Sequence, residues 1–321
     1  MNQVNIGILG CAAIAERLVI PAINASDNFN LVAIASRSCK KAGSFASKFG
    51  CEAIEGYQNL VDRDDIDAVY IPLPIGLHQE WVISSLENGK HVLCEKSLAP
   101  DFSTVNSMVE TARGQSLVLI ENFMFAFHSQ HQFVLDKLKS GEIGEIRCFR
   151  SSFGFPPFTD DNIRYSKALG GGSLLDAGTY TVKATRLILG DEIEVTSAFL
   201  GHEAGKEVDI YGGASLVSGS GHISQIAFGF DNYYQCSYEI WGSKGKLISE
   251  RAFTAGPDIM PKITIEKQNE RHEYTLPRDN HFLNILGHFH ESIQNRILEQ
   301  NYSELLNQSR LLTQIQEYAA R

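Results

Sequence analysis

The first 37 residues place a strand, a tight turn and a second strand in an order that few folds accept. An apolar run, Val4–Leu9, leads into the small-residue segment Gly10–Ala15, and a second run, Leu31–Ala35, ends at Ser36-Arg37. Glycine at position 10 can leave the strand sharply, and the start of the helix that follows presents backbone amides to an anion. This order is typical of a dinucleotide-binding βαβ unit. The alternative is that the small residues serve packing alone.

The turn departs from the usual Gly-x-Gly-x-x-Gly/Ala pattern at one position. The pattern would run from Gly10 to Ala15, but its second glycine is Ala12. The added methyl group lies where the backbone approaches a pyrophosphate, so the phosphates would sit slightly higher. Ala15 is small enough for the helix to pack closely on the strand. The sequence therefore still predicts nucleotide binding.

The end of the second strand indicates which dinucleotide is bound. Sites for NAD usually carry an Asp or Glu there to accept hydrogen bonds from the ribose, whereas sites for NADP often offer an Arg to the 2′-phosphate. Here the strand ends on Ser36 and Arg37, and Lys40 and Lys41 follow. We expect NADP(H) to be favoured over NAD(H). The competing interpretation is a solvated basic cluster at a helix start.

Composition excludes several classes of function. The 321 residues suffice for two domains, and the net charge of −10 argues against nucleic-acid binding. No apolar run approaches the roughly 20 residues that span a bilayer, and the N-terminus lacks the pattern of a signal peptide. Six scattered cysteines without a Cys-x-x-Cys pair suggest reduced thiols and a cytoplasmic location.

The chain is predicted to be α/β with two domains. Over residues 1–121, apolar runs alternate with helical stretches, which predicts a doubly wound parallel sheet of the Rossmann type. Over residues 122–321, strand-like runs are not separated by long helices, which predicts an α+β domain with a large, mostly antiparallel open sheet. Helical patterns at 282–297 and 302–320 end the chain, and these helices are able to pack back on the first domain.

Two segments carry residue types suited to chemistry on a carbonyl. The strand His91–Cys94 ends in Glu95-Lys96, and a lysine in a cleft can polarise a carbonyl and pass a proton. The segment Gly170–Tyr180 places Asp176 and Tyr180 four residues apart, so on a helix they share a face and could hold sugar hydroxyl groups. The alternatives are a charged surface loop and a flexible loop before an amphipathic helix.

Other candidate sites are weaker. His128 and His131 are three residues apart and could ligate a metal, but no acidic ligand pattern accompanies them. His288 and His290 are two apart and do not face one another on a helix. We therefore expect no metal, because a bound cofactor would carry the redox chemistry.

Together these segments resemble the Gfo/Idh/MocA family of NAD(P)-dependent sugar oxidoreductases over nearly the whole chain. Five stretches in the right order carry the resemblance: Ile6–Ala15, Val69–His78, Gly89–Lys96, Gly141–Glu145 and Gly170–Tyr180. The resemblance implies that Lys96 is the catalytic lysine of the Glu-Lys-Pro motif, and that Asp176 and Tyr180 lie in the substrate pocket. Tyr180, where many relatives have His, together with Ser36-Arg37, looks most like NADPH-dependent 3-ketoreductases of nucleotide-linked deoxysugars and the glucose–fructose oxidoreductase branch.

The same resemblance implies a set of cofactor contacts. These are expected from Gly10, Ala12, Ala13, Ile14, Ser36, Arg37, Leu73, Pro74, His78, Glu95 and Lys96. The chain departs from the family pattern where Ser97 replaces Pro, which removes a rigid turn after Lys96. It also departs at Ile75, where many members have Asn or Thr, at Ala126, where many have Arg, and at Ser129, where many have Pro.

We therefore expect an NADP(H)-dependent oxidoreductase that transfers hydride between nicotinamide and a sugar carbonyl or hydroxyl, with a nucleotide-linked keto-sugar as the expected substrate. Lys96 or Tyr180 would protonate the alkoxide, and Asp176 would orient a hydroxyl or the lysine. The alternatives are an NADP-dependent aldose or cyclic-diol dehydrogenase, and a redox sensor that binds NADP(H) without turnover. The open sheet and the relatives suggest a homodimer or homotetramer, with no nucleic-acid or membrane partner.

Overall fold

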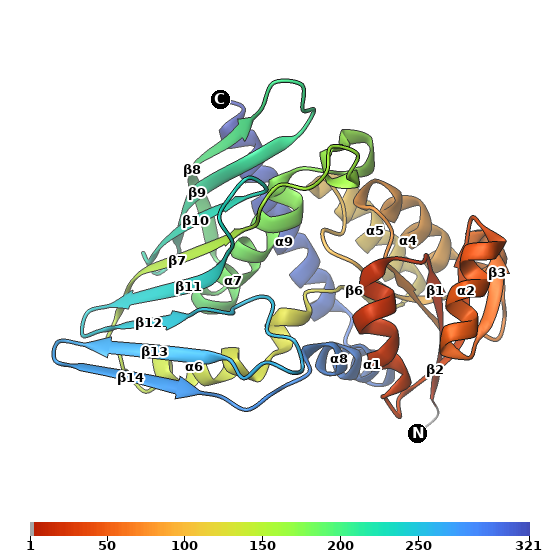
Figure 1. The fold of residues 1–321 in the computed structure, drawn as a ribbon, viewed down its shortest axis with the longest axis horizontal. Coiled ribbons are helices and arrows are strands. Elements are labelled where there is room, and N and C mark those ends of the chain that lie inside the picture. The colour runs from red at the N-terminus through yellow and green to blue at the C-terminus, as the bar shows by residue number, and fades with distance from the viewer. Residues whose placement is uncertain (1–2) are drawn as a thin grey trace. The chain divides into compact units, whose positions relative to one another are not determined.

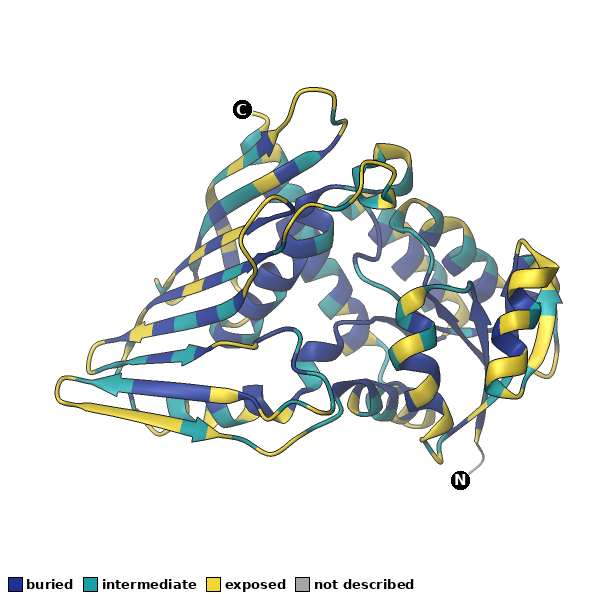
Figure 2. Cartoon of the chain, in the orientation of Figure 1, coloured by how far each residue is buried: buried dark blue, intermediate teal, exposed yellow. Residues whose placement is uncertain are grey.

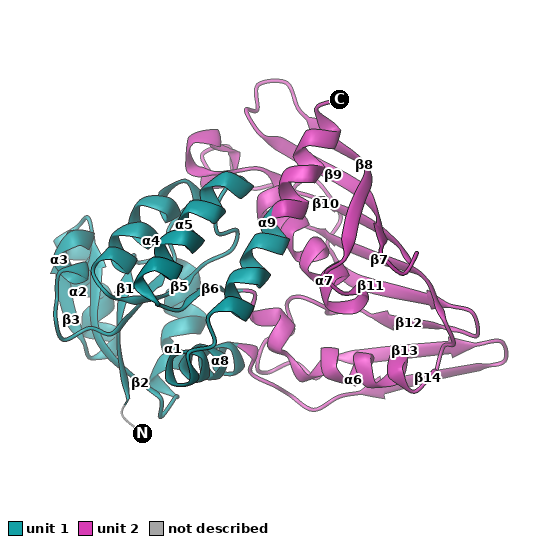
Figure 3. Ribbon diagram, turned by 180° about the vertical axis from the view of Figure 1, so that it is seen from behind, with its two compact units in different colours: residues 1–122, 282–309 teal, residues 123–281, 310–321 magenta. Residues whose placement is uncertain are grey.

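The computed structural model describes residues 3–321 and divides into two compact units. The N-terminal unit combines residues 1–122 with 282–309, and the C-terminal unit combines residues 123–281 with 310–321 (Figure 3). The helical segment 282–309 therefore belongs to the N-terminal unit, although about 160 residues separate it from the rest of that unit in the sequence.

The N-terminal unit is built on a six-stranded parallel sheet with the strand order β3-β2-β1-β4-β5-β6. This is the order of a doubly wound dinucleotide-binding fold. Figure 1 shows α1 and α2 on one face of the sheet, and Figure 3, from behind, shows α4 and α5 on the other. The strands are β1 (Val4–Leu9), β2 (Phe29–Ser36), β3 (Glu52–Glu55), β4 (Ala68–Ile71), β5 (His91–Cys94) and β6 (Leu119–Glu121).

The sequence patterns located five of these strands and missed β3. β3 lies at the sheet edge, pairs with β2 alone, and is mostly exposed, so it lacks the apolar signature of the interior strands. The helices of this unit are α1 (Ile20–Asn24), α2 (Cys39–Phe49), α3 (Tyr57–Val61), α4 (His78–Glu87), α5 (Phe102–Gln115), α8 (His281–Asn295) and the first half of α9 (Glu299–Ala319).

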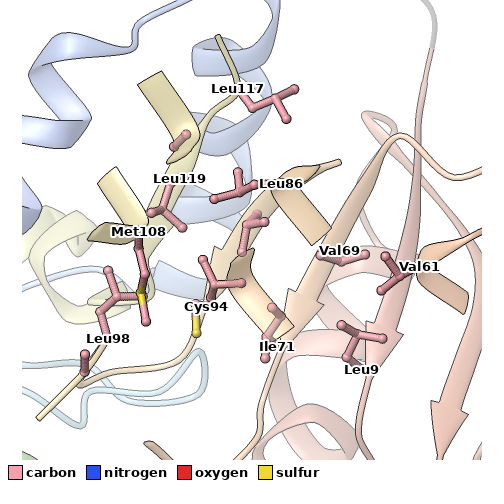
Figure 4. Packing of buried hydrophobic residues seen from close by; sticks show 14 of the residues in the cluster. Leu9, Val61, Val69, Ile71, Leu86, Cys94, Leu98, Met108, Leu117 and Leu119 are labelled. Atoms are coloured by element: carbon pink, nitrogen blue, oxygen red, sulfur yellow. The ribbon is translucent and has the colours of Figure 1, made fainter. Parts of the chain in front are cut away.

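The core of this unit gathers side chains from the sheet and from α3, α4, α5 and α9. Figure 4 shows Val69, Ile71 and Leu119 from the strands packed with Leu86 and Met108 from the helices. Tyr302 of α9 is fully buried, and its hydroxyl donates a hydrogen bond of 2.5 Å to the Leu117 carbonyl. This bond ties the distant helix α9 to the end of the sheet.

The C-terminal unit is built on an eight-stranded sheet with the order β14-β13-β12-β11-β7-β10-β9-β8. β7 and β10 run parallel, whereas the other neighbouring pairs are antiparallel. The strands are β7 (Ile146–Gly154), β8 (Ile193–His202), β9 (Asp209–Ser218), β10 (Ile223–Gly229), β11 (Gln235–Gly242), β12 (Lys246–Ser249), β13 (Lys262–Lys267) and β14 (Glu270–Thr275). The two sheets confirm the expected fold class.

Buried and exposed residues alternate along several strands of the C-terminal unit, as Figure 2 shows. One sheet face is therefore covered and the other is open, which is the pattern of a half-buried antiparallel sheet. The covered face packs against α7 (Thr179–Leu189) and the turn that precedes it. The unit also contains α6 (Ser129–Lys139) and the end of α9.

Two stretches that the sequence presents as single helices each begin with a π-helical turn. Ala15–Val19 precedes α1, and Leu174–Gly178 precedes α7. The extra residue per turn is a feature that hydrophobic periodicity does not reveal, and such turns often occur at functional sites. Among residues 3–321, no helix is both long and apolar enough to cross a membrane.

Candidate active site

The turn after β1 has the conformation that a glycine permits. Gly10 has a φ of 129°, and its amide donates to the Ala35 carbonyl at 3.0 Å. A Cβ atom on residue 10 would lie 2.8 Å from the Leu73 side chain, so this close approach also requires glycine. Ala12 and Ile14 are partly buried and Ala13 is exposed in the first turn of the following helix.

The end of β2 presents a charged side chain beside a second strand end. Ser36 is buried, its carbonyl accepts from the Gly56 amide at 2.9 Å, and Arg37 is exposed. Ser38 caps α2 by accepting from the Lys41 amide. Tyr57, which sequence reasoning missed, lies next to Arg37: burial raises the pKa of its hydroxyl, and the guanidinium opposes that shift.

The segment after β4 contacts the turn after β1 and the loop after β5. Leu73 lies against Gly10, and the Pro74 carbonyl accepts from the Leu77 amide at 2.9 Å, which forms a single 3₁₀ turn before α4. His78 begins α4 and is completely buried. Its ring nitrogens face backbone carbonyls, and burial lowers the pKa of the imidazole.

The end of β5 holds a carboxylate in a small buried network. The Glu95 amide donates to Ile71 O at 3.0 Å, and Glu95 Oε1 accepts from the Tyr70 hydroxyl and from Asn122 Nδ2, each at 2.6 Å. Burial raises the pKa of the Glu95 carboxyl group, and the two donors oppose that shift. Lys96 follows and is partly buried.

These four segments follow β1, β2, β4 and β5, which are neighbours in the sheet. Their residues therefore meet at one edge, outside the carboxyl ends of parallel strands, where such sheets bind ligands. Tyr70 and Asn122 were not anticipated, because one is a strand residue and the other follows β6. A polar side chain on an otherwise apolar strand, as at Tyr70, was the available signal.

The C-terminal unit holds the other two proposed catalytic residues. Asp176 lies in the π-helical turn, and its Oδ2 accepts from Arg164 Nε at 2.6 Å. The Arg164 guanidinium also lies over the Phe158 ring, 4.7 Å from its centroid. This ion pair was not predicted from the sequence, because Arg164 lies in the loop before the glycine run.

Tyr180 is the second residue of α7 and is buried among aromatic rings. Its ring centroid lies 5.0 to 5.9 Å from the rings of Phe123, Phe125, Phe153 and Phe253. Contacts at these distances hold a ring in one orientation. These rings explain how a phenol hydroxyl can be held in a defined place at the start of a helix.

The glycine run before Asp176 serves the fold of this unit. Gly172 has a φ of 116°, and a Cβ there would collide with Asp209, whose Oδ2 accepts from the Ser173 hydroxyl and the Leu174 amide at 2.7 Å each. Glycine is therefore required at position 172 by the fold of this segment.

The candidate metal-binding histidines are engaged within the C-terminal unit. His131 Nδ1 lies 2.9 Å from the Tyr238 hydroxyl, and its Nε2 lies 3.0 Å from the Ala252 carbonyl. His128 Nδ1 accepts from the Gln130 amide at the start of α6. Within residues 3–321, no three His, Cys, Asp or Glu side chains are grouped as metal ligands.

The fold and the strand-end residues define an oxidoreductase with a dinucleotide-binding domain, and comparison with known proteins agrees. Residues 4–123 match the oxidoreductase family with an NAD-binding Rossmann fold, and residues 131–248 match the GFO/IDH/MocA C-terminal domain. The chain belongs to the Gfo/Idh/MocA family, which confirms the resemblance seen in the sequence.

Three relatives place the chain within this family. It is 41% identical over 91% of its length to dTDP-3,4-didehydro-2,6-dideoxy-alpha-D-glucose 3-reductase from Actinomadura kijaniata, covering 88% of that protein. It is 35% identical over 80% of its length to D-xylose 1-dehydrogenase (NADP(+)) 2 from Haloferax volcanii, covering 79% of it. It also matches the crystal structure of a 3-ketoreductase from Actinomadura kijaniata in complex with NADP and TDP-benzene, with a TM-score of 0.96, 39% identity, and coverage of 99% and 98% of the two chains.

The buried His131 predicts a loss of stability in acid. Burial lowers its pKa from 6.5 to about 3, so the unfolded chain binds a proton more readily than the folded one. The stability that neutral His131 contributes to the folded chain is complete above pH 6.5. It is lost as the pH falls toward 3, and the free energy of unfolding then drops by about 1.4 kcal/mol per pH unit. Urea unfolding at pH 8, 6 and 5 measures this slope.

A His131→Gln variant serves as the control, because its side chain does not titrate. We expect it to be less stable at pH 8 and to show a shallower decline between pH 6 and 5. An equal slope in the variant and the wild type would contradict the assignment.

Proposed function

We propose that the protein reduces the keto group of a nucleoside-diphosphate-linked deoxysugar with NADPH. The main support is the 41% identity to a dTDP-keto-sugar 3-reductase over nine-tenths of the chain. The N-terminal unit fits NADPH, since Gly10 leaves room for a close backbone approach and β2 ends without an acid beside the exposed Arg37. The Arg37 guanidinium would pair with the 2′-phosphate.

The proposed roles of Lys96 and Tyr180 rest on residue chemistry and on spacing. The Actinomadura ketoreductase has been solved with a lysine changed to alanine and with a tyrosine changed to phenylalanine. The number of residues between that lysine and that tyrosine in the ketoreductase sequence equals the number between Lys96 and Tyr180 in this sequence. A lysine and a tyrosine are both able to donate a proton to an oxygen.

In this mechanism the bound cofactor supplies the hydride to the carbonyl carbon. The protein supplies the proton: Lys96 or Tyr180 donates it to the carbonyl oxygen as the C=O bond becomes an alcohol. Asp176, held by Arg164, accepts hydrogen bonds from a neighbouring sugar hydroxyl or orients the lysine. The Glu95 network fixes the backbone from which Lys96 projects.

Substitution of the two proposed proton donors tests this mechanism. We expect Lys96→Met and Tyr180→Phe to bind NADPH almost normally and to lose most turnover, in the range of 10²- to 10⁴-fold for general acid catalysis. Steady-state assays with nucleoside-diphosphate-linked keto-sugars, and fluorescence titration with NADPH, provide the two measurements. Near-normal turnover in both variants would exclude the mechanism.

The same assays separate the second candidate function. The 35% identity to an NADP-linked xylose dehydrogenase supports oxidation of a free aldose, for which free sugars and cyclic diols with NADP⁺ would be the better substrates. A redox sensor would bind NADPH and transfer hydride to none of these compounds.

The preference for NADPH is tested at Arg37. Arg37→Ala removes a charge-assisted hydrogen bond of about 1.5 to 3 kcal/mol, so the Kd for NADPH should rise roughly 10- to 150-fold. The Kd for NADH should change little, because NADH has no 2′-phosphate. Lys48→Ala is the matched control, because Lys48 lies at the far end of α2, the helix that follows Arg37, and pairs with Glu16. Equal losses for both cofactors in Arg37→Ala would contradict the assignment.

We also propose a cytoplasmic location, in which the six unpaired cysteines remain reduced.

We propose self-association through the open face of the large sheet. Strand register puts Phe199, Tyr211, Ile223 and Trp241 on this one face. Phe199 is 61% exposed and Trp241 52% exposed. Large apolar side chains gathered on an open face mark an interaction surface.

Charge on this face should dissociate the assembly. We expect the wild type to sediment as a dimer or tetramer, and Ile223→Glu and Trp241→Glu to sediment as monomers, because a carboxylate in an apolar interface lacks a partner. Met260→Glu is the control, since Met260 is 50% exposed in the segment before β13. A monomeric wild type would rule the surface out.

A further inference from the structure

The His78 ring lies between two loops that the proposed reaction uses. The side chain is completely buried at the start of α4. Its Nδ1 lies 3.0 Å from Ser97 O and 3.1 Å from Leu98 O, and its Nε2 lies 2.8 Å from Leu73 O. Both nitrogens therefore face backbone carbonyls of its own unit, on the loops that follow β4 and β5.

Ser97 and Leu98, whose carbonyls contact Nδ1, are the two residues after Lys96 in the sequence. Their backbone is held from a second side as well, because the Leu98 amide donates to Glu121 Oε1 at 2.8 Å. Ser97 is itself buried, although it replaces the proline that would have stiffened this turn. The loop carrying Lys96 is thus held by His78 of α4 and Glu121 of β6.

Geometry also indicates which nitrogen carries the proton. Burial lowers the pKa of His78, the backbone carbonyls that its nitrogens face oppose that shift, and the neighbouring Lys96 adds to it. With its pKa lowered overall, the ring is taken as neutral with one N–H. A proton on Nε2 would leave two carbonyls facing a lone pair, whereas a proton on Nδ1 leaves one. The Nδ1–H tautomer is therefore the favoured form.

We propose that His78 is a positioning residue for Lys96, and that its Nδ1–H, shared by the Ser97 and Leu98 carbonyls, fixes the backbone from which the lysine reaches the substrate. This inference rests on the proposed function of Lys96. It assigns His78 a role that differs from direct contact with the cofactor, because neither ring nitrogen is turned away from the chain's own carbonyls.

Two conservative variants separate the contacts of the two nitrogens. In His78→Asn the side-chain NH₂ occupies the place of Nδ1, whereas in His78→Gln it reaches the place of Nε2. We expect His78→Gln to lose roughly 10- to 100-fold in kcat with a KM for NADPH within about threefold of the wild type, as for a displaced catalytic group. His78→Asn should retain at least about tenfold more kcat than His78→Gln.

Hydrogen exchange provides a readout that does not depend on turnover. Amides of the segment 94–100 should exchange faster in His78→Gln than in His78→Asn, because the former releases the loop. His91→Asn is the matched control at the opposite end of β5, where His91 Nδ1 accepts from the Val118 amide at 3.0 Å. It should leave both kcat and exchange of 94–100 unchanged.

Each outcome decides the inference. Equal kcat in His78→Asn and His78→Gln, or a loss confined to KM, would overturn it, as would equal exchange of 94–100 in the two variants. If the wild type reduces no sugar with NADPH, the proposed function fails. The exchange comparison then still shows whether His78 holds the loop.

Discussion

The site depends on how the polar groups at the end of β5 are satisfied where the apolar sheet ends. Glu95 places a carboxylate in this region. The free-energy cost of burying that carboxylate is offset by hydrogen bonds from the Tyr70 hydroxyl and the Asn122 side-chain amide. The next backbone groups are held by His78 and Glu121. Because these partners come from β4, α4 and β6, the position of Lys96 is set by the whole sheet rather than by its own loop.

The strand order of the same sheet is enough to bring the proposed cofactor-binding segments together. β2, β1, β4 and β5 are parallel neighbours, so Arg37, Gly10, Leu73 and Glu95 emerge at one edge. Parallel pairing gives this alignment, because the carboxyl ends of neighbouring parallel strands lie at the same edge of the sheet. The close contact of Gly10 with Leu73 directly joins the segment after β1 to the segment after β4.

The sequence predicted what is local and periodic. Strand ends, the Gly10 turn and the spacing of Asp176 and Tyr180 are readable because each depends on neighbouring residues. The partners of these residues were not predictable: Arg164 reaches Asp176 from a loop, and Tyr70 and Asn122 reach Glu95 across 25 and 27 residues. β3 escaped notice because an exposed edge strand has no apolar pattern.

The surroundings of Tyr180 and Asp176 differ in a way that suits different roles. Four phenylalanine rings surround the Tyr180 ring, so its orientation is fixed by packing. Asp176 instead pairs with the Arg164 guanidinium. A neutral phenol can donate a proton and a paired carboxylate can only accept hydrogen bonds. These two environments fit the proposed roles, in which Lys96 or Tyr180 donates the proton and Asp176 orients a hydroxyl or the lysine.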